Sequence, residues 1–240
     1  MKKILVCEDE DAIRDFVVIN LKRADYEVVD VNSGEKALAE FKKAQNSADE
    51  SVRPFDVALL DIMMPGIDGT EVCKQIREES NSIGIIMLSA KSQEMDKITC
   101  LTIGADDYVT KPFSPSELVA RVDAIYRRVS LNASSGANGK ELTSGPFSVN
   151  TKSRVIMKDG EIVDLTQVEY QIMEYFIKNS GVALDRKSIL VHIWGEGYFG
   201  DDKIVDVNIR RLRMKVENDP SSPVYIQTVW GYGYKWTTDN

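Results

Sequence analysis

Residues 57–69, "VALLDIMMPGIDG", place a carboxylate directly at the end of an apolar run. Asp61 closes the run, and Pro65, Gly66 and Gly69 follow it closely. An apolar run without polar alternation is typical of a strand that is covered on both faces, as in a parallel sheet. The stretch therefore predicts a buried strand with an acid at its carboxyl end, followed by a stiffened turn.

Similar apolar runs occur on both sides of this stretch, at residues 2–7, 27–31, 83–88 and 107–110. Helical patterns separate the runs, and a last one closes this half of the chain at 114–128. Its opening, Ser114-Pro115-Ser116-Glu117, has the pattern of a capping box with proline at the first helical position. Strands alternating with helices predict an α/β, doubly wound, five-stranded parallel domain over residues 1–128.

Length and composition set broad limits on the kind of protein. With 240 residues, 43% of them apolar, the chain can form two domains with substantial cores. No apolar stretch is long enough to span a membrane, and the N-terminal run is too short for a signal peptide, so we expect a cytoplasmic protein with no membrane partner. Cys7, Cys73 and Cys100 lie far apart without metal-binding spacing, which favours packing roles.

Polar side chains follow four of the predicted strands. Glu8 and Asp9 follow the first, Asp61 ends the third, Ser89 follows the fourth and Lys111 follows the fifth. Because ligands of open parallel sheets bind beyond the carboxyl ends of the strands, we expect these side chains to share one site. Clustered carboxylates require a cation, and Mg²⁺ prefers oxygen ligands. A carboxylate held there can form an acyl phosphate, with Lys111 neutralising the transferring oxygens.

The motifs "CEDE", "LLDIMMPGIDG", "LSAK" and "GADDYVTKPF" make residues 1–128 resemble the receiver domains of two-component response regulators. The resemblance implies that Asp61 is the phospho-acceptor and that a sensor histidine kinase is the donor. It further implies Mg²⁺ bound by Glu8, Asp9, Asp61 and the carbonyl of Met63, a switch pair of Ser89 and Tyr108, and a Lys111 followed by a cis proline. The single histidine, His192, lies in the apolar segment "ILVHIWG" and is expected to pack.

The same resemblance implies a homodimer on phosphorylation. The expected face combines the fourth helix, the fifth strand and the last helix of this half. The expected pairs across a two-fold axis are Lys97–Glu117 and Asp107–Arg121, with apolar contacts from Ile98, Leu101 and Ala120.

The second half has a different organisation. Residues 129–140, "VSLNASSGANGK", predict a flexible linker because they are small, polar and rich in glycine. Strand patterns follow at 147–150, 154–160 and 161–165, helical patterns at 166–179, 186–195 and 203–218, and a glycine-tipped hairpin at 224–236. The order predicts an α+β, winged helix-turn-helix domain over residues 141–240.

The helix predicted at 203–218 has two distinct faces. Val205, Ile209, Leu212 and Val216 fall on one stripe, and the opposite face is expected to carry Lys203, Val207, Arg210, Arg211 and Met214. Although the chain has a net charge of -8, this segment concentrates positive charge, as a helix in a DNA major groove requires.

The motifs "LTQVEYQIMEYFIKN", "LVHIWG", "VDVNIRRLRMKVE" and "IQTVWGYGYKW" resemble winged helices of the OmpR/PhoB type. The resemblance implies a phosphorylation-dependent, DNA-binding transcription regulator whose partners are promoter DNA and, through residues 194–202, RNA polymerase. The implied DNA contacts are Lys203, Val207, Asn208, Arg210, Arg211, Arg213 and Trp230.

This half departs from the family pattern at several of these positions. Lys203-Ile204 stands where Arg-Thr is usual, Asn208 where histidine is common, and Trp230 where an arginine often precedes the wing tip. Trp230 either stacks on a DNA sugar or packs on its own domain.

Two alternatives to a phosphorylation-dependent regulator fit the sequence less well. A phosphatase of the haloacid-dehalogenase type needs a second acid two residues after its nucleophile, where this chain has Met63. A regulator that binds DNA without phosphorylation is disfavoured because all the expected acceptor-site side chains are present. The sequence therefore predicts a regulator and not an enzyme.

Overall fold

The computed structural model describes residues 2–47, 49, 52–90, 99–130, 141–196, 198 and 201–238, without the side chains of 127–130. The chain divides into two compact units, Met1–Val129 and Ser130–Asn240. Most of the expected linker, residues 131–140, lies outside the described residues. No described helix is long and apolar enough to cross a membrane.

The first unit alternates strands and helices as predicted. Its elements are β1 (Lys2–Cys7), α1 (Asp11–Arg23), β2 (Tyr26–Val31), α2 (Gly34–Gln45), β3 (Val57–Asp61), α3 (Gly69–Glu79), β4 (Gly84–Ser89), β5 (Asp107–Thr110) and α5 (Pro115–Ser130). Residues 99–102 are helical and belong to the helix expected between β4 and β5, while 91–98 lie outside the described part of the chain.

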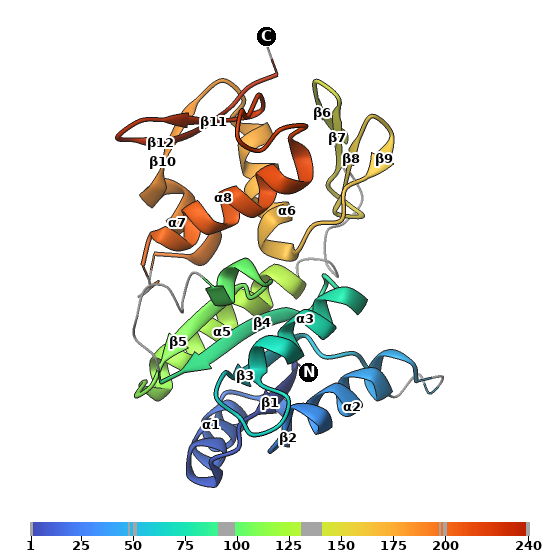
Figure 1. The fold of residues 1–240 in the computed structure, drawn as a ribbon, viewed down its shortest axis with the longest axis vertical. Coiled ribbons are helices and arrows are strands. Elements are labelled where there is room, and N and C mark those ends of the chain that lie inside the picture. Colours follow the sequence, from blue (N-terminus) through green and yellow to red (C-terminus); the bar gives the residue numbers. More distant parts are fainter. Residues whose placement is uncertain are drawn as a thin grey trace. The chain divides into compact units, whose positions relative to one another are not determined.

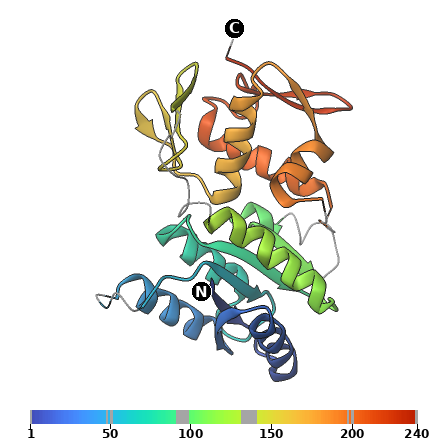
Figure 2. The same ribbon diagram turned by 180° about the vertical axis from the view of Figure 1, so that it is seen from behind.

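The strands of this unit form one parallel sheet in the order β2-β1-β3-β4-β5 (Figure 1). Helices α1 and α5 pack on one face of the sheet, through Val17, Leu21, Leu118, Val122 and Ile125, and α2 and α3 cover the other (Figures 1 and 2). The apolar residues of β3 are fully buried, as the uninterrupted run at 57–60 predicts. The expected fold class is confirmed.

The turn after β3 depends on a close approach of the backbone. A Cβ atom on Gly69 would lie 2.0 Å from the carbonyl oxygen of Asp61, so a side chain there would displace the start of α3. Asp68 caps the same helix by accepting a hydrogen bond from the Glu71 amide at 2.9 Å. Together these features fix the acid at the strand end.

The second unit contains three helices among short strands. Its elements are β6 (Glu141–Ser144), β7 (Phe147–Asn150), β8 (Val155–Lys158), β9 (Glu161–Ile162), α6 (Gln167–Lys178), β10 (Ala183–Asp185), α7 (Arg186–Trp194), α8 (Lys203–Val216), β11 (Ile226–Val229) and β12 (Gly233–Trp236). The strands form two antiparallel sheets, in the orders β6-β7-β8-β9 and β10-β12-β11. Strands β6 and β10 were not predicted, because both are short and have little apolar alternation.

An aromatic cluster joins the two sheets of this unit. The fully buried ring of Trp236 packs edge-on against Phe147 at 5.1 Å, and Phe147 packs on Tyr225 at 4.9 Å. The Trp236 indole also donates a hydrogen bond to the Ser144 hydroxyl at 2.8 Å. Trp236 therefore links β12 to β6 and β7 across the core.

A buried carboxylate connects α6 to α8. Glu169 forms a capping box with Thr166 and lies 2.9 Å from the Arg211 guanidinium and 2.8 Å from the Lys215 ammonium. Burial alone would raise the pKa of Glu169, but the two cations and the hydrogen bonds lower it below its ordinary value. Glu169 therefore contributes to stability as an ion.

Replacing this carboxylate is expected to destabilise the second unit. Glu169→Gln leaves Arg211 buried without its counter-ion, which should lower the free energy of unfolding by about 3 kcal/mol. Because the folded pKa is depressed, the wild-type contribution is present above the ordinary pKa of about 4.3 and is lost as the pH falls through the lower, folded pKa. The variant should lack this pH dependence.

Urea unfolding followed by tryptophan fluorescence measures the effect, since Trp194, Trp230 and Trp236 all lie in this unit. Glu161→Gln, on the exposed β9, is the matched control and should change stability little. Equal effects of the two substitutions would show that the Glu169 ion pairs do not stabilise the unit.

Candidate functional site

The carboxyl ends of β1 and β3 bring three acids together. Glu8 and Asp9 directly follow β1, Asp61 ends β3, and these two strands are neighbours in the sheet. One carboxylate oxygen from each residue lies within 4.8 Å of the others. Glu8 and Asp61 are buried, at 0% and 3% exposure. The three residues therefore lie beside one another, as their positions at the strand ends predict.

Lys111 enters the same site from the end of β5. Its ammonium lies 2.8 Å from Glu8 Oε2 and 3.0 Å from Asp61 Oδ1. Burial acts to lower the pKa of Lys111, but the two carboxylates outweigh it and raise that pKa above its ordinary value. Burial also raises the pKa of Glu8. Lys111 is therefore a fixed positive charge in the site.

The charges of this cluster do not balance. One ammonium faces three carboxylates, two of them buried, so a divalent cation would neutralise the excess negative charge. Carboxylate oxygens are the ligands that Mg²⁺ prefers, and it retains several waters of its own. The donor set therefore fits the metal that the sequence predicted.

The remaining predicted receiver residues lie on β4, on β5 and in the loop after β3. Ser89 ends β4 beside β3 and β5, and Tyr108 lies in β5; both are buried, at 3% and 6% exposure. Met63, two residues beyond Asp61, is 58% exposed. The Lys111-Pro112 peptide bond is cis, as expected. Their roles in switching and metal binding stay predictions.

Two residues that position the acidic loops were missed by the sequence analysis. The Arg14 guanidinium donates to the carbonyl oxygen of Glu8 at 2.9 Å and so holds the loop after β1. Glu35, in the first turn of α2, accepts a hydrogen bond from the Ile67 amide at 3.1 Å and holds the loop after β3. Because both contacts join separate elements, no local spacing in the sequence indicates them.

The predicted dimer face contains a network within one chain. Arg121 donates to both carboxylate oxygens of Asp107, at 3.1 and 3.0 Å, and to Glu117 Oε1 at 3.2 and 2.9 Å. Leu101 is buried and Ala120 is exposed. Lys97 and Ile98 lie outside the described residues. The pairs expected across a two-fold axis stay a prediction, and Arg121 makes its described ion pairs within its own chain.

The expected division of α8 into two faces holds only in part. Val205, Ile209, Leu212 and Val216 are buried at 0–1% exposure, as predicted. The expectation that Val207 and Arg211 face outward is wrong, since both are 8% exposed, and the DNA-contact candidate Asn208 is fully buried. The physical reason is that α6 and α7 both contact α8, which buries a wider arc of the helix than a single stripe.

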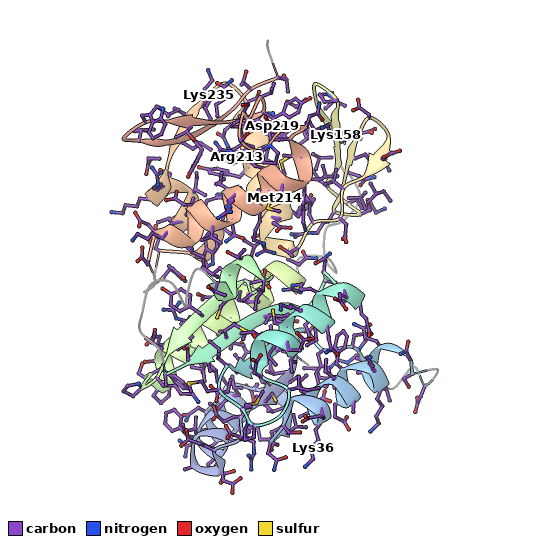
Figure 3. The ribbon with its side chains drawn as sticks, viewed as in Figure 1. Lys36, Lys158, Arg213, Met214, Asp219 and Lys235 are labelled. Atoms are coloured by element: carbon purple, nitrogen blue, oxygen red, sulfur yellow. The ribbon has the colours of Figure 1, made fainter. Side chains whose placement is uncertain are left out.

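Three of these DNA-contact candidates make contacts within their own unit, and Asn208 makes its contact within α8. Arg211 pairs with Glu169, and the Asn208 amide donates to the Ile204 carbonyl at 2.8 Å. Arg213 belongs to α8 (Figure 3), and its guanidinium reaches the β11–β12 hairpin, where it donates to the Ile226 carbonyl and the Thr228 hydroxyl. Burial lowers the pKa of Arg213. Its guanidinium therefore joins α8 to the β11–β12 hairpin (226–236), which we call the wing.

The outward edge of α8 is narrower than predicted but still cationic. Lys203 and Arg210 are exposed there, together with Met214 at 65% exposure. Trp230, at the tip of the hairpin, is 91% exposed, which excludes the alternative that it packs on its own domain.

Comparison with known protein families gives two matches. Residues 4–123 match the response regulator receiver domain, and residues 160–236 match the family described as transcriptional regulatory protein, C terminal. The two matches correspond to the two units of the fold.

Individual relatives span nearly the whole chain. The sensory transduction protein RegX3 of Mycolicibacterium smegmatis is 41% identical over 98% of this chain and 99% of its own length. The alkaline phosphatase synthesis transcriptional regulatory protein PhoP of Bacillus subtilis is 40% identical over 98% of this chain and 96% of its own. The crystal structure of the response regulator DrrB of Thermotoga maritima, an OmpR/PhoB homolog, is 30% identical, covers 99% of both chains and superposes with a TM-score of 0.50.

Proposed function

Because this chain belongs to the OmpR/PhoB family of two-component response regulators, DNA-binding transcription factors that are phosphorylated on their receiver domain, we propose that Asp61 is the residue that accepts the phosphoryl group. The observation that carries the proposal is the cluster of Glu8, Asp9 and Asp61 around the single ammonium of Lys111. In this proposal residues 1–128 form the receiver, 129–140 the linker and 141–240 the DNA-binding domain.

The chemistry follows from the positions of these side chains. A carboxylate oxygen of Asp61 attacks the phosphorus of a phosphohistidine, the P–N bond breaks, and the imidazole leaves with the electron pair. Lys111 stays beside Asp61 and pairs with the new phosphoryl oxygens. Mg²⁺, held by Glu8, Asp9, Asp61 and the carbonyl of Met63, would supply further neutralisation of their charge. The Ser89 hydroxyl donates to the phosphoryl group, and Tyr108 moves with it as the second member of the switch pair.

The phosphoryl donor is a separate protein, the cognate sensor histidine kinase. The chain's single histidine, His192, stacks on Tyr175 with ring centroids 3.8 Å apart in the other unit. A mainly apolar cavity of about 550 Å³ borders Lys111 and is lined by Ile13, Phe16, Ala90, Pro112 and Phe113, among others. We assign this surface to the kinase, because a donor docked there brings its histidine next to Asp61.

Mg²⁺ is expected to stabilise the receiver through the acidic cluster. A concentration of ten times Kd should raise its free energy of unfolding by about 1.4 kcal/mol. Asp9→Asn removes one clustered charge, so it should stabilise the metal-free receiver and abolish most of the Mg²⁺ effect.

Calorimetry of the full chain with and without Mg²⁺ measures both changes. Asp15→Asn, exposed on α1, is the control and should keep the full response to Mg²⁺. An undiminished response of the Asp9 variant would mean that the metal does not bind at this cluster.

Phosphorylation is proposed to produce a homodimer through the face around Asp107, Glu117 and Arg121. The three side chains already form one network, which can exchange partners with a second chain. Phosphorylation adds charge beside Ser89 and Tyr108, and Tyr108 directly follows Asp107 in β5.

Light scattering with beryllofluoride, a phosphoryl mimic, is expected to show a doubled molecular mass. Ala120→Glu, which adds a charge at an exposed position of α5, should keep the chain monomeric without removing a buried contact. An unchanged mass of the wild type would reject dimerisation on phosphorylation.

The outward edge of α8 is proposed to bind promoter DNA, through Lys203 and Arg210. These side chains are exposed, in contrast to Val207, Asn208, Arg211 and Arg213. RNA polymerase is the proposed partner of residues 194–202, of which 197, 199 and 200 lie outside the described residues. With DNA and a kinase as its proposed partners, we expect the protein to act in the cytoplasm.

Arg210→Ala is expected to weaken DNA binding by about 1–3 kcal/mol, since an arginine on this edge contacts a phosphate or a base. Lys152→Ala, which removes an exposed cation in the turn between β7 and β8, should change binding little. Fluorescence anisotropy on duplexes selected from a random pool compares them, and equal losses would mean that α8 is not the recognition helix.

A further inference from the structure

Among the described residues of the second unit, the most exposed aromatic residue lies at the tip of the hairpin. Trp230 is 91% exposed, whereas Trp194 and Trp236 are 2% and 0% exposed. Tyr232, two residues further, is 50% exposed. Tryptophan is enriched among the residues that contribute most to binding energy at interfaces. A ring left in water at this position indicates a binding surface.

The hairpin presents this ring from a defined turn. Residues 230–232 connect β11 to β12, whose last ladder pair is Val229 with Gly233, and the Tyr232 amide donates to the Val229 carbonyl at 3.0 Å. Gly231 has a φ of +73°, in the left-handed region that closes such three-residue hairpin loops. A Cβ atom on Gly233 would lie 2.1 Å from the Leu184 carbonyl oxygen, so the hairpin lies tightly against β10.

The base of the hairpin is joined to α8 by several polar contacts. Glu217, at the end of α8, accepts hydrogen bonds from the amides of Val224, Tyr225 and Ile226 at 2.9, 2.9 and 2.7 Å. Arg213 donates to the Ile226 carbonyl, as described above. The hairpin projects from the edge of the unit in both ribbon views (Figures 1 and 2). The position of the hairpin relative to α8 is therefore fixed, so a ligand bound along α8 lies at a set distance from the tip.

The second contact between hairpin and helix lies nearer the tip. The Tyr234 hydroxyl donates to Asp206 at 2.6 Å, and Asp206 also accepts from Arg186 at 2.8 Å. Because α8 is thus tied to the hairpin near both of its ends, the tip keeps its position relative to Lys203 and Arg210.

The charge of the hairpin suits a polyanion. Between Asp219 and Asp239 the sequence has no acidic residue, and its one charged residue is Lys235. The tip itself, residues 230–232, is uncharged. It therefore offers a neutral aromatic surface in the same unit as the cationic edge of α8, without repelling phosphates.

We propose that Trp230 recognises DNA by inserting its indole ring as an apolar wedge into the groove next to the site bound by α8. The proposal rests on the DNA-binding role proposed for α8. Apolar wedges partly unstack a base step, and pyrimidine–purine steps unstack most easily. Trp230 therefore favours sites with such a step at the position of the wing, through a contact that does not depend on salt.

The salt dependence of binding separates this contact from a charged one. With the full chain and duplexes selected from a random pool, Trp230→Ala should lose about tenfold in affinity, as for base–aromatic stacking. The slope of log K against log salt should stay that of the wild type, whereas Arg210→Ala should reduce its magnitude by about 0.9. Trp230→Phe should retain most of the affinity.

Sequence preference and fluorescence give two further readouts. Replacing the selected pyrimidine–purine step at the wing with a G·C-rich step should weaken the wild type severalfold but leave Trp230→Ala unchanged. Bound DNA should also shield the wild-type tryptophan emission from acrylamide. In Trp230→Phe the remaining emission comes from buried Trp194 and Trp236 and should be shielded with or without DNA.

Different failures have different meanings. If Trp230→Ala binds DNA like the wild type while Arg210→Ala does not, the wedge is refuted and α8 is still the recognition helix. If Trp230→Ala impairs transcription by RNA polymerase without changing DNA affinity, the tip serves a protein partner and the wedge is again refuted. If the wild type selects no DNA at all, the proposed function itself fails.

Discussion

The ion pairs of Lys111 with Glu8 and Asp61 are the interaction on which the receiver site depends. They join the ends of β1, β3 and β5, and they hold two carboxylates in a place from which water is largely excluded. Burying such charges without a partner would be costly, and one ammonium compensates only part of the charge. The Lys111 ion pairs therefore allow the carboxylates to be buried but leave a net negative charge in the site. A divalent cation can neutralise this charge.

The second unit contains buried carboxylates with the opposite property. Glu169 has two cations and a backbone amide, and Glu217 accepts hydrogen bonds from three backbone amides. Both carboxylates are bound by groups of their own chain, and they connect α6, α8 and the wing. The structural acids and the receiver-site acids Glu8 and Asp61 are buried to a similar degree. They differ in how many donors and cations of their own chain bind each carboxylate.

The sequence predicted the acidic cluster because simple geometry governs it. In a parallel sheet every strand delivers the residue after its end to the same edge, so Glu8, Asp9, Asp61 and Lys111 had to meet. The contacts of Arg14 and Glu35 with the surrounding loops have no such rule, since they depend on how α1 and α2 pack. On α8 the sequence predicts the stripe of buried apolar residues, but it does not predict how wide the buried face of the helix is. Arg210 and Arg211 look equivalent in sequence, but the packing of α6 and α7 on α8 buries Arg211 against Glu169 and leaves Arg210 exposed.

We propose that the excess negative charge at the ends of β1 and β3 prepares Asp61 to accept the phosphoryl group. The most direct test is mass spectrometry of the full chain after incubation with acetyl phosphate, with and without Mg²⁺, followed by peptide mapping. The mass should rise by one phosphoryl group only when Mg²⁺ is present, and the modified residue should be Asp61. A phosphoryl group on any other residue, or equal modification without the metal, would contradict this account.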